Sequence, residues 1–329
     1  MHAIRQYAFG GPEELRYEEM PDPSPGAGQV RVAVAAAGVH LLDTTIRSGT
    51  SGGPFPLPEL PMTPGREVAG VVDALGPGVP ERWLGRRVVV HLGPGGSGGY
   101  AELAVADVAA LHELPDHVPF TAAVAMVGTG RTAVGILRFA QLTAADVVLV
   151  PAAAGGIGGL LVQHARNVGA TAIGLAGGED KVALVRKLGV VGVDYTDPAW
   201  PGAVRAELGD REVTVVLDGV GGAVGRFALE LLGVGGRILL FGWSAGEPTQ
   251  VSTDILASRG LTASWAIGPR LLRQPGGLYP MAAEALAGLA AGEWEPLVNE
   301  PFPLAEAAAA HRALESRATA GKVVLVPTR

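Results

Sequence analysis

Cysteine is absent from the 329-residue sequence, and aromatic residues make up only 5% of it. Without cysteine there is no disulfide framework, no thiolate nucleophile and no cysteine-ligated zinc or iron–sulfur centre. Charged residues are also scarce, at 17%, and the net charge is -7 with no basic run. Nucleic-acid binders are usually basic, so no nucleic-acid partner is expected. The composition is that of an apolar globular protein, and any chemistry that this chain performs cannot use a thiol.

Uninterrupted hydrophobic runs are lacking as well. The N-terminal residues contain no apolar segment of the kind that directs secretion. Val147–Gln163 has 17 residues without a charge, but it contains Pro151 and several glycines, and His164 follows at once. A membrane-spanning helix needs about 20 residues without such breakers. We therefore expect no membrane association and a cytoplasmic location.

What the sequence does contain predicts an α/β protein of two domains. Its length corresponds to about two domains at roughly 150 residues each. Strand-like runs such as Val30–Ala36 and Val68–Leu75 lie among Pro/Gly clusters in the first 115 or so residues, which favours a β-rich barrel or sandwich. After Thr121, apolar strands alternate with helices, which is typical of a parallel sheet covered on both faces. We expect residues 119–261 to form this second domain, and residues 262–329 to pack with residues 1–118.

The most informative motif lies in residues 147–163, VVLVPAAAGGIGGLLVQ. A predicted strand leads through small residues, Ala152–Gly158, directly into a predicted helix. Small residues allow a tight turn and a close approach to a pyrophosphate, which the helix N-terminus attracts. The strict glycine fingerprint has Gly at position 153, where this chain has Ala153. The motif predicts a dinucleotide-binding turn, and a packing turn without ligand is the alternative.

The end of the next strand indicates which dinucleotide is bound. An NAD site places Asp or Glu there to hold the ribose 2′-hydroxyl, whereas this chain reads Ile173–Gly178 without an acid. Gly177 and Gly178 leave room for a 2′-phosphate, and Lys181 on the first helical turn is placed to pair with it. Nearby acidic residues oppose this, and Lys181 as a solvated surface residue is the alternative. We expect NADPH as the cofactor.

Several segments together resemble one family. The sequence is similar to the zinc-free quinone oxidoreductases (the zeta-crystallin-like group) of the medium-chain dehydrogenase/reductase superfamily. The segments that carry the resemblance are Gly38–Gly49, Pro64–Val72, Gly99–Glu102, Ala152–Gly158 and Glu315–Lys322. The resemblance implies a GroES-like β-rich catalytic domain, a Rossmann doubly wound parallel-sheet domain, and NADPH bound between them.

The resemblance also implies roles for particular residues in cofactor binding. The 2′-phosphate would be held by Lys181, Tyr195 and Arg317, close to Gly177. Residues expected at the pyrophosphate and at the nicotinamide are Ala154, Gly155, Gly156, Ile157, Thr132, Gly242, Trp243 and Ser244. For Tyr195, Arg317, Thr132 and Trp243 a purely structural role is the alternative, and Trp243 could also be a wall of the substrate pocket.

Zinc is not expected. The places of the zinc ligands in metal-dependent relatives match His40, Arg66 and about Gly128. A guanidinium is a permanent cation with no acceptor, so Arg66 cannot bind a metal ion. Of the three matching positions, only His40 has a side chain that could bind a metal ion.

Substrate contacts are expected from His40, Thr45 and Arg47. His40 and Thr45 stand where the resembling family commonly has Asn and Tyr, so the pocket would differ from that of its relatives. His40 could donate a hydrogen bond or a proton to the reduced oxygen, since histidine titrates near neutral pH. The alternatives are a histidine satisfied within its turn, Asp43 as a helix cap, and Arg47 as a surface charge.

The sequence thus predicts NADPH-dependent transfer of a hydride to a quinone or another conjugated carbonyl, without metal. A reductase of enone or enal double bonds, and a non-catalytic NADPH sensor or structural protein, remain open. The resemblance implies a homodimer joined at the edge of the parallel sheet, near Thr249–Leu256 or Leu261–Trp265.

Overall fold

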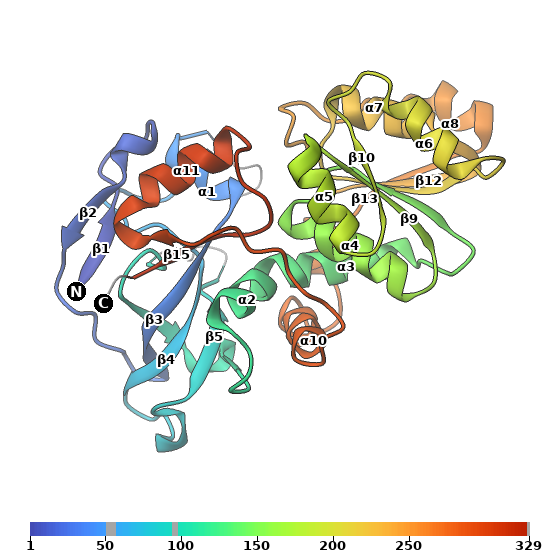
Figure 1. Cartoon of the computed structure of the whole chain (residues 1–329). Coiled ribbons are helices and arrows are strands. Elements are labelled where there is room, and N and C mark those ends of the chain that lie inside the picture. The colour runs from blue at the N-terminus through green and yellow to red at the C-terminus, as the bar shows by residue number, and fades with distance from the viewer. Residues whose placement is uncertain (51–56, 94–97, 328–329) are drawn as a thin grey trace. The chain divides into compact units, whose positions relative to one another are not determined.

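The computed structural model describes residues 1–50, 57–93 and 98–327, which fall into two compact units. The first domain consists of Met1–Gly128, Ala285–Gly292 and the residues from Val298 to the C-terminus, and the second of Thr129–Glu284 and Glu293–Leu297. The order of elements along the chain can be followed by colour in Figure 1. Each domain has a sheet of its own, and each is described separately.

The first domain is built on antiparallel strands. Its main sheet has the order β14-β15-β3-β4-β5-β7, with β6 also paired to β3, and β1 pairs with β2 in a separate ribbon. The strands are β1 His2–Arg5, β2 Arg16–Glu19, β3 Gln29–Val39, β4 Glu67–Leu75, β5 Arg87–His91, β6 Leu103–Asp107, β7 His112–Glu113, β14 Phe302–Pro303 and β15 Val323–Val326. Alternate residues of β3 are buried along its first half, as expected for a strand with one face on the core. The predicted β-rich first domain is confirmed.

Strand β3 organises this domain because it pairs with three others. It pairs with β4 over Val30–Ala37, while Gln29–Ala33 also pairs with β6 and Ala37–Val39 with β15. The helical segments are α1 Leu41–Arg47, α2 Phe120–Ala125 and α11 Ala307–Glu315, with short 3-10 turns η1 Pro12–Glu14, η2 Glu81–Trp83, η3 Val108–Ala110 and η5 Leu304–Glu306. Helix α1 starts directly where β3 ends, so the β3–β15 pairing fixes its first turn.

The second domain contains a six-stranded parallel sheet in the order β10-β9-β8-β11-β12-β13. Its strands are β8 Val147–Val150, β9 Thr171–Ala176, β10 Val191–Asp194, β11 Val213–Asp218, β12 Leu232–Leu240 and β13 Thr262–Trp265. Its helices are α3 Arg131–Ala140, α4 Gly156–Asn167, α5 Glu179–Lys187, α6 Trp200–Leu208, α7 Gly222–Glu230, α8 Thr253–Arg259 and α9 Pro269–Leu272. The strand order reverses between β8 and β11, which is the switch point of a Rossmann sheet. The predicted doubly wound parallel sheet is confirmed.

The predicted boundary between the domains needs correction. Residues 262–284 and 293–297 belong to the second domain rather than to the first, and residues 119–128 belong to the first. The physical reason is that Thr262–Trp265 pairs in parallel with β12 and completes the sheet as its sixth strand. The boundary then passes through α10, Tyr279–Ala290. β13 lies at an edge of the sheet, whereas Thr249–Leu256 leads into α8, so only Leu261–Trp265 remains as a candidate edge strand.

One helical segment is long and apolar enough to cross a membrane by length and composition. It runs over Phe120–Ala140, through a π-helical turn at Met126–Gly130, and 72% of its most apolar window is buried inside the protein. Buried core helices pass the same test, so the segment is weak evidence for a membrane span. Val147–Gln163, the uncharged stretch noted in the sequence, forms β8, a turn and the first turns of α4.

Candidate active site

Three ionisable side chains of the first domain meet at one point. His40 precedes α1, Glu67 starts β4, and Lys322 precedes β15. The Nε2 atom of His40 lies 2.9 Å from Oε1 of Glu67 and 3.2 Å from Nζ of Lys322, which forms an ion pair with the same oxygen. The side chains of Glu67 and Lys322 are 0% and 4% exposed, whereas that of His40 is 24% exposed. Of the three, only His40 therefore offers much surface to a ligand.

Neighbouring basic groups stabilise the negative charge of Glu67. Burial raises the pKa of its carboxyl, but the positive charges of His40 and Lys322, a hydrogen bond with His40 and the charge of His91 outweigh burial and bring the pKa well below its usual range. The carboxylate fits because Gly128 has no side chain: a Cβ there would overlap Oε2 of Glu67 and lie 3.2 Å from Cε1 of His40. The site is thus a buried carboxylate shared by two basic groups.

The donor set at this point does not fit zinc. Of the three places expected from the metal-dependent relatives, Gly128 has no side chain, and the Nε of Arg66 lies 3.3 Å from Oδ1 of Asp43. The remaining place, His40, has its Nε2 beside the cation of Lys322. Within residues 1–50, 57–93 and 98–327, no group of three or more metal-binding side chains is close enough to hold an ion.

A buried chain of hydrogen bonds fixes the position of α1. The guanidinium of Arg47 can only donate, so Nδ1 of His311, at 3.3 Å, is the acceptor. The other ring nitrogen of His311 then donates to the hydroxyl of Tyr100 at 3.2 Å, and this hydroxyl donates to Oδ2 of Asp43 at 3.1 Å. Oδ2 also accepts from the backbone amide of His40 at 2.9 Å. The chain of hydrogen bonds therefore connects α11 to His40, which carries the partly exposed imidazole.

The predicted substrate contact of Arg47 is wrong. Its side chain is 4% exposed, and it donates to the Gly10 carbonyl at 3.1 Å and to Glu315 at 2.7 Å. It therefore ties α1 to α11 rather than facing a ligand. Thr45 is half-buried, and its hydroxyl donates to the Leu41 carbonyl at 3.3 Å. Its proposed substrate contact stays a prediction.

A pH dependence of stability follows from His311. Burial lowers the pKa of His311 to about 4, and the nearby guanidinium of Arg47 acts in the same direction. The unfolded chain takes up a proton near pH 6.5, whereas the folded domain does so only near pH 4. The stabilisation is therefore complete above pH 6.5 and is lost as the pH falls towards 4, by about 3 kcal/mol in total. Urea unfolding at pH 7, 5.5 and 4.5 should show this loss, and His311→Gln should reduce it.

The matched control for this experiment is His117→Gln, because His117 is exposed. It should leave the pH dependence as in the unaltered protein. Equal slopes for the His311 and His117 variants would contradict the role given to His311.

The second domain forms the turn that the sequence predicted. β8 ends at Val150, α4 begins at Gly156, and Gly155, Gly156 and Ile157 are partly exposed while Ala154 is buried. The first amides of a helix have no acceptor within it, so they are available to a phosphate. A Cβ on Gly158 would overlap the Ala152 carbonyl oxygen and lie 2.8 Å from Cα of Ala153, so helix and turn touch directly. This is the close approach that the third glycine of the fingerprint provides.

The departure from the fingerprint at Ala153 has a local explanation. Ala153 is fully buried, and its amide donates to the Leu175 carbonyl of β9 at 2.8 Å. A Cβ on Gly174, also in β9, would lie 2.6 Å from the methyl carbon of Ala153. The missing glycine of the turn is thus compensated by a glycine on the neighbouring strand.

The structure brings two of the predicted 2′-phosphate residues to one end of the sheet. A Cβ on Gly177, after β9, would lie 3.2 Å from the hydroxyl of Tyr195, which follows β10. Lys181 is half-buried on the first turn of α5. The sequence reasoning missed Asp194, whose Oδ1 accepts hydrogen bonds from the amides of Gly178 and Thr196 at 3.0 and 2.8 Å. These hydrogen bonds lower the pKa of Asp194 and satisfy its charge within the turn.

At the same carboxyl end of the parallel strands, but over the other half of the sheet, Gly242, Trp243 and Ser244 follow β12. The amide of Ser244 donates to the Gly219 carbonyl at 3.1 Å, and Trp243 is 48% exposed. Thr132 is half-buried in the first turn of α3, after the π-helical turn. Arg317 belongs to the first domain, where it is exposed after α11 with a positive φ of 57°. The cofactor roles of these residues stay predictions.

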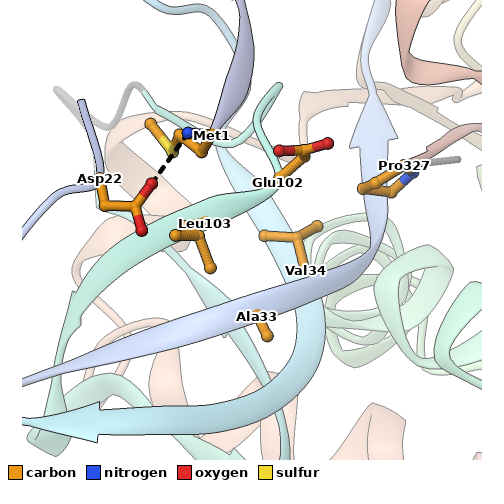
Figure 2. Close-up of a pocket in the computed structure, with 7 residues that line it drawn as sticks. All are labelled: Met1, Asp22, Ala33, Val34, Glu102, Leu103 and Pro327. Carbon is orange, nitrogen blue, oxygen red and sulfur yellow. Dashed lines mark hydrogen bonds and ion pairs between the residues drawn. The ribbon is translucent and has the colours of Figure 1, made fainter. Parts of the chain in front are cut away.

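The largest omissions of the sequence reasoning are Glu67, Lys322, Tyr100 and His311. Glu67, Lys322 and Tyr100 lie in the segments that resemble the family, but they come close to His40 only when the chain is folded. A hollow of about 310 Å³ lies elsewhere in the first domain, where the N-terminal ammonium pairs with Asp22 (Figure 2). It is lined by Met1, Asp22, Ala33, Val34, Glu102, Leu103 and Pro327, none of which belongs to the His40 cluster.

Comparison with known proteins agrees with this geometry. Residues 26–116 match the family described as alcohol dehydrogenase GroES-like domain, and residues 189–325 match that described as zinc-binding dehydrogenase. A quinone oxidoreductase of Pseudomonas aeruginosa is 34% identical over 98% of this chain and 99% of its own. A 2-haloacrylate reductase of a Burkholderia species is 32% identical over 97% of this chain and 96% of its own.

A solved structure extends the comparison to three dimensions. The Escherichia coli quinone oxidoreductase complexed with NADPH superimposes with a TM-score of 0.86 and 30% identity, over 99% of this chain and 100% of its own. A GroES-like domain followed by a Rossmann domain defines a medium-chain dehydrogenase/reductase. Within that superfamily the chain belongs to the quinone oxidoreductase family, whose members are oxidoreductases. The predicted family and fold class are confirmed.

Proposed function

We propose that this chain transfers a hydride from NADPH to a quinone or a related conjugated carbonyl compound. The observation that carries the proposal is the βα turn of the second domain, together with an adjacent strand end that has Gly177, Tyr195 and Lys181 but no acid in β9 itself. This arrangement fits a dinucleotide with a 2′-phosphate. The NADPH complex of the Escherichia coli relative supports the same choice.

The chain's own residues would bind the cofactor and the acceptor, orient them and shield them from solvent. The turn Ala154–Ile157 would hold the pyrophosphate, and Lys181 and Tyr195 the 2′-phosphate. The bound cofactor supplies the hydride, so the protein needs no nucleophile. His40, the exposed member of its cluster, would donate a hydrogen bond to the oxygen that gains electron density, with Glu67 and Lys322 holding the ring in place.

The second candidate is reduction of a conjugated carbon–carbon double bond. The name of the Burkholderia relative, a 2-haloacrylate reductase, favours it. Both reactions use the same cofactor and differ only in the acceptor. We further propose that the protein acts in the cytoplasm as a homodimer joined through β13, the edge strand of the parallel sheet.

The test of cofactor choice compares NADPH and NADH oxidation with a panel of quinones and enones. Lys181→Ala should lower the ratio of kcat/KM for NADPH over NADH by about tenfold, because one charge-assisted contact to the 2′-phosphate is lost. Lys187→Ala on the same helix is the control, since Lys187 is exposed at the helix C-terminus. A preference for NADH in the unaltered protein would refute the assignment of the 2′-phosphate site. NADPH binding without turnover on any acceptor would favour a sensor.

A further inference from the structure

The turn after β9 is fixed to the turn after β10 by contacts between consecutive residues. The two strands pair in parallel, and their last residues, Ala176 and Asp194, lie opposite each other. The amide of Tyr195 donates to the Ala176 carbonyl at 3.0 Å. A Cβ on Gly177 would lie 3.2 Å from the hydroxyl oxygen of Tyr195 and 3.3 Å from its Cε2 and Cζ. The Tyr195 ring therefore lies against the backbone of Gly177.

The carboxylate of Asp194 adds a second tie, one residue further along. Its Oδ1 accepts hydrogen bonds from the Gly178 amide at 3.0 Å, from the Thr196 amide at 2.8 Å and from the Thr196 hydroxyl at 2.7 Å. Gly178 directly precedes α5 and has a φ of 86°, which favours glycine. Its carbonyl accepts from the Val182 amide at 3.1 Å, in the first turn of the helix. Asp194 thus holds the start of α5 against the turn after β10.

Both segments held in this way carry a residue that we assign to the 2′-phosphate. Lys181 is the third residue of α5 and is half-buried, and Tyr195 is the chain neighbour of Asp194. One carboxylate oxygen is therefore bonded to the segment of Lys181 and to that of Tyr195. Groups that bind one ligand together do so more tightly when their spacing is fixed beforehand.

A carboxylate near a phosphate would ordinarily repel it, but the charge of Asp194 is satisfied by its own donors. The hydrogen bonds from the Gly178 amide and from Thr196 hold the pKa of Asp194 below its usual range, so the carboxyl stays ionised and remains an acceptor. Of the acidic residues on the first turn of α5, Glu179 pairs with Arg186 at 2.7 Å and Asp180 is exposed. The contribution of Asp194 is therefore expected from geometry rather than from charge.

We propose that Asp194 is a positioning residue that sets the preference for NADPH over NADH by holding Lys181 and Tyr195 at a fixed spacing. The proposal rests on the proposed function and adds a residue that determines its cofactor specificity. Asp194 acts only through the two residues that it holds. Its loss should therefore weaken recognition of the 2′-phosphate and leave the pyrophosphate contacts of Ala154–Ile157 as they are.

The kinetic test compares NADPH with NADH in variants of Asp194. Asp194→Ala should lower the ratio of kcat/KM for NADPH over that for NADH about tenfold, mainly through the KM for NADPH. Asp194→Asn should keep most of the preference, because its carboxamide oxygen can accept the same hydrogen bonds. Asp197→Ala is the matched control: Oδ1 of Asp197 also accepts from an amide two residues on, that of Ala199 at 2.8 Å, but within the turn before α6. It should leave the ratio unchanged.

A double-mutant cycle tests whether Asp194 acts through Lys181. Asp194→Ala should lower the ratio clearly less in a Lys181→Ala background than in the unaltered protein, because one of the residues that it positions is already gone. Equal losses in both backgrounds would overturn the proposal. Equal losses on NADPH and NADH would overturn it as well, since they indicate general damage to the domain. So would a gain in NADPH preference in both Asp194→Ala and Asp194→Asn, which would show that the carboxylate only repels the phosphate.

A binding readout keeps the test independent of turnover. Calorimetry should show that the unaltered protein binds adenosine 2′,5′-bisphosphate more tightly than adenosine 5′-monophosphate, and this preference should fall about tenfold in Asp194→Ala. A preference that is unchanged in Asp194→Ala would overturn the role of Asp194 alone. Equal binding of both nucleotides by the unaltered protein would refute the NADPH assignment and the proposal with it. Binding as expected without turnover on any quinone would refute the reaction and leave the role of Asp194 standing.

Circular dichroism checks that each variant is folded. If Asp194→Ala is not, Asp194→Glu takes its place, because it keeps the charge but moves the carboxylate oxygens one methylene further from the backbone. It should show the same loss of preference, and an unchanged ratio in Asp194→Glu would overturn the proposal.

Discussion

Replacing Glu67 with alanine should lower the free energy of unfolding of the first domain by about 3–5 kcal/mol. The Lys322 ammonium is 4% exposed and pairs with Glu67, so removal of the carboxylate leaves a buried cation without its partner. The His40 imidazole loses the same acceptor. Urea unfolding, followed by circular dichroism and fluorescence, measures the change.

Two further variants separate this effect from a simple loss of packing. Adding Lys322→Met to Glu67→Ala should recover part of the stability, because no buried charge then remains unpaired. Glu113→Ala removes an exposed pair, in which Arg86 and Glu113 are both 54% exposed, and should cost less than about 1 kcal/mol. If Glu67→Ala and Glu113→Ala were equally mild, the buried cluster would not contribute as described.

Replacing Gly158 with alanine should raise the Kd for NADPH at least 100-fold, or about 2.7 kcal/mol. The new methyl would overlap the Ala152 carbonyl oxygen and approach Cα of Ala153, and both are backbone atoms that cannot turn aside. The start of α4 would have to move away from the turn, which displaces the amides proposed to hold the pyrophosphate. A fluorescence titration with NADPH measures the affinity, and circular dichroism checks the fold.

Gly202 offers the control for this substitution. It lies in α6, and a Cβ there meets no atom within 4 Å. Gly202→Ala should therefore leave the NADPH affinity unchanged and, as a Gly→Ala change in a helix, stabilise slightly. An unchanged Kd for Gly158→Ala would show that the turn does not hold the dinucleotide.

Patterns within one segment were predicted well from the sequence. The strand–turn–helix at 147–163 and the alternation that follows it depend on local composition and periodicity, and the structure has both. The domain boundary was missed because Thr262–Trp265 is short and half-exposed, and its membership in the sheet is decided by pairing with β12 rather than by its own residues.

Only those residues of the candidate site that a local sequence pattern marks could be predicted. His40 was singled out, but its partners come from β4 and from the segment before β15, 27 and 282 residues further along. Arg47 has the right sequence position for a substrate contact, yet its partner Glu315 turns it into a tie between two helices. Which side chains meet is set by the β3 pairings, and no local pattern records those.

The glycine at position 128 limits how this protein could be redesigned. Restoring a metal centre would require a ligand side chain there, and the space is already filled by a carboxylate that starts from a different strand. The new ligand would have to displace Glu67, and Lys322 would then be left as a cation beside the incoming metal ion. Conversion to a metalloenzyme therefore needs several residues to change together, because Arg66 cannot ligate a metal ion and a side chain at position 128 would collide with Glu67.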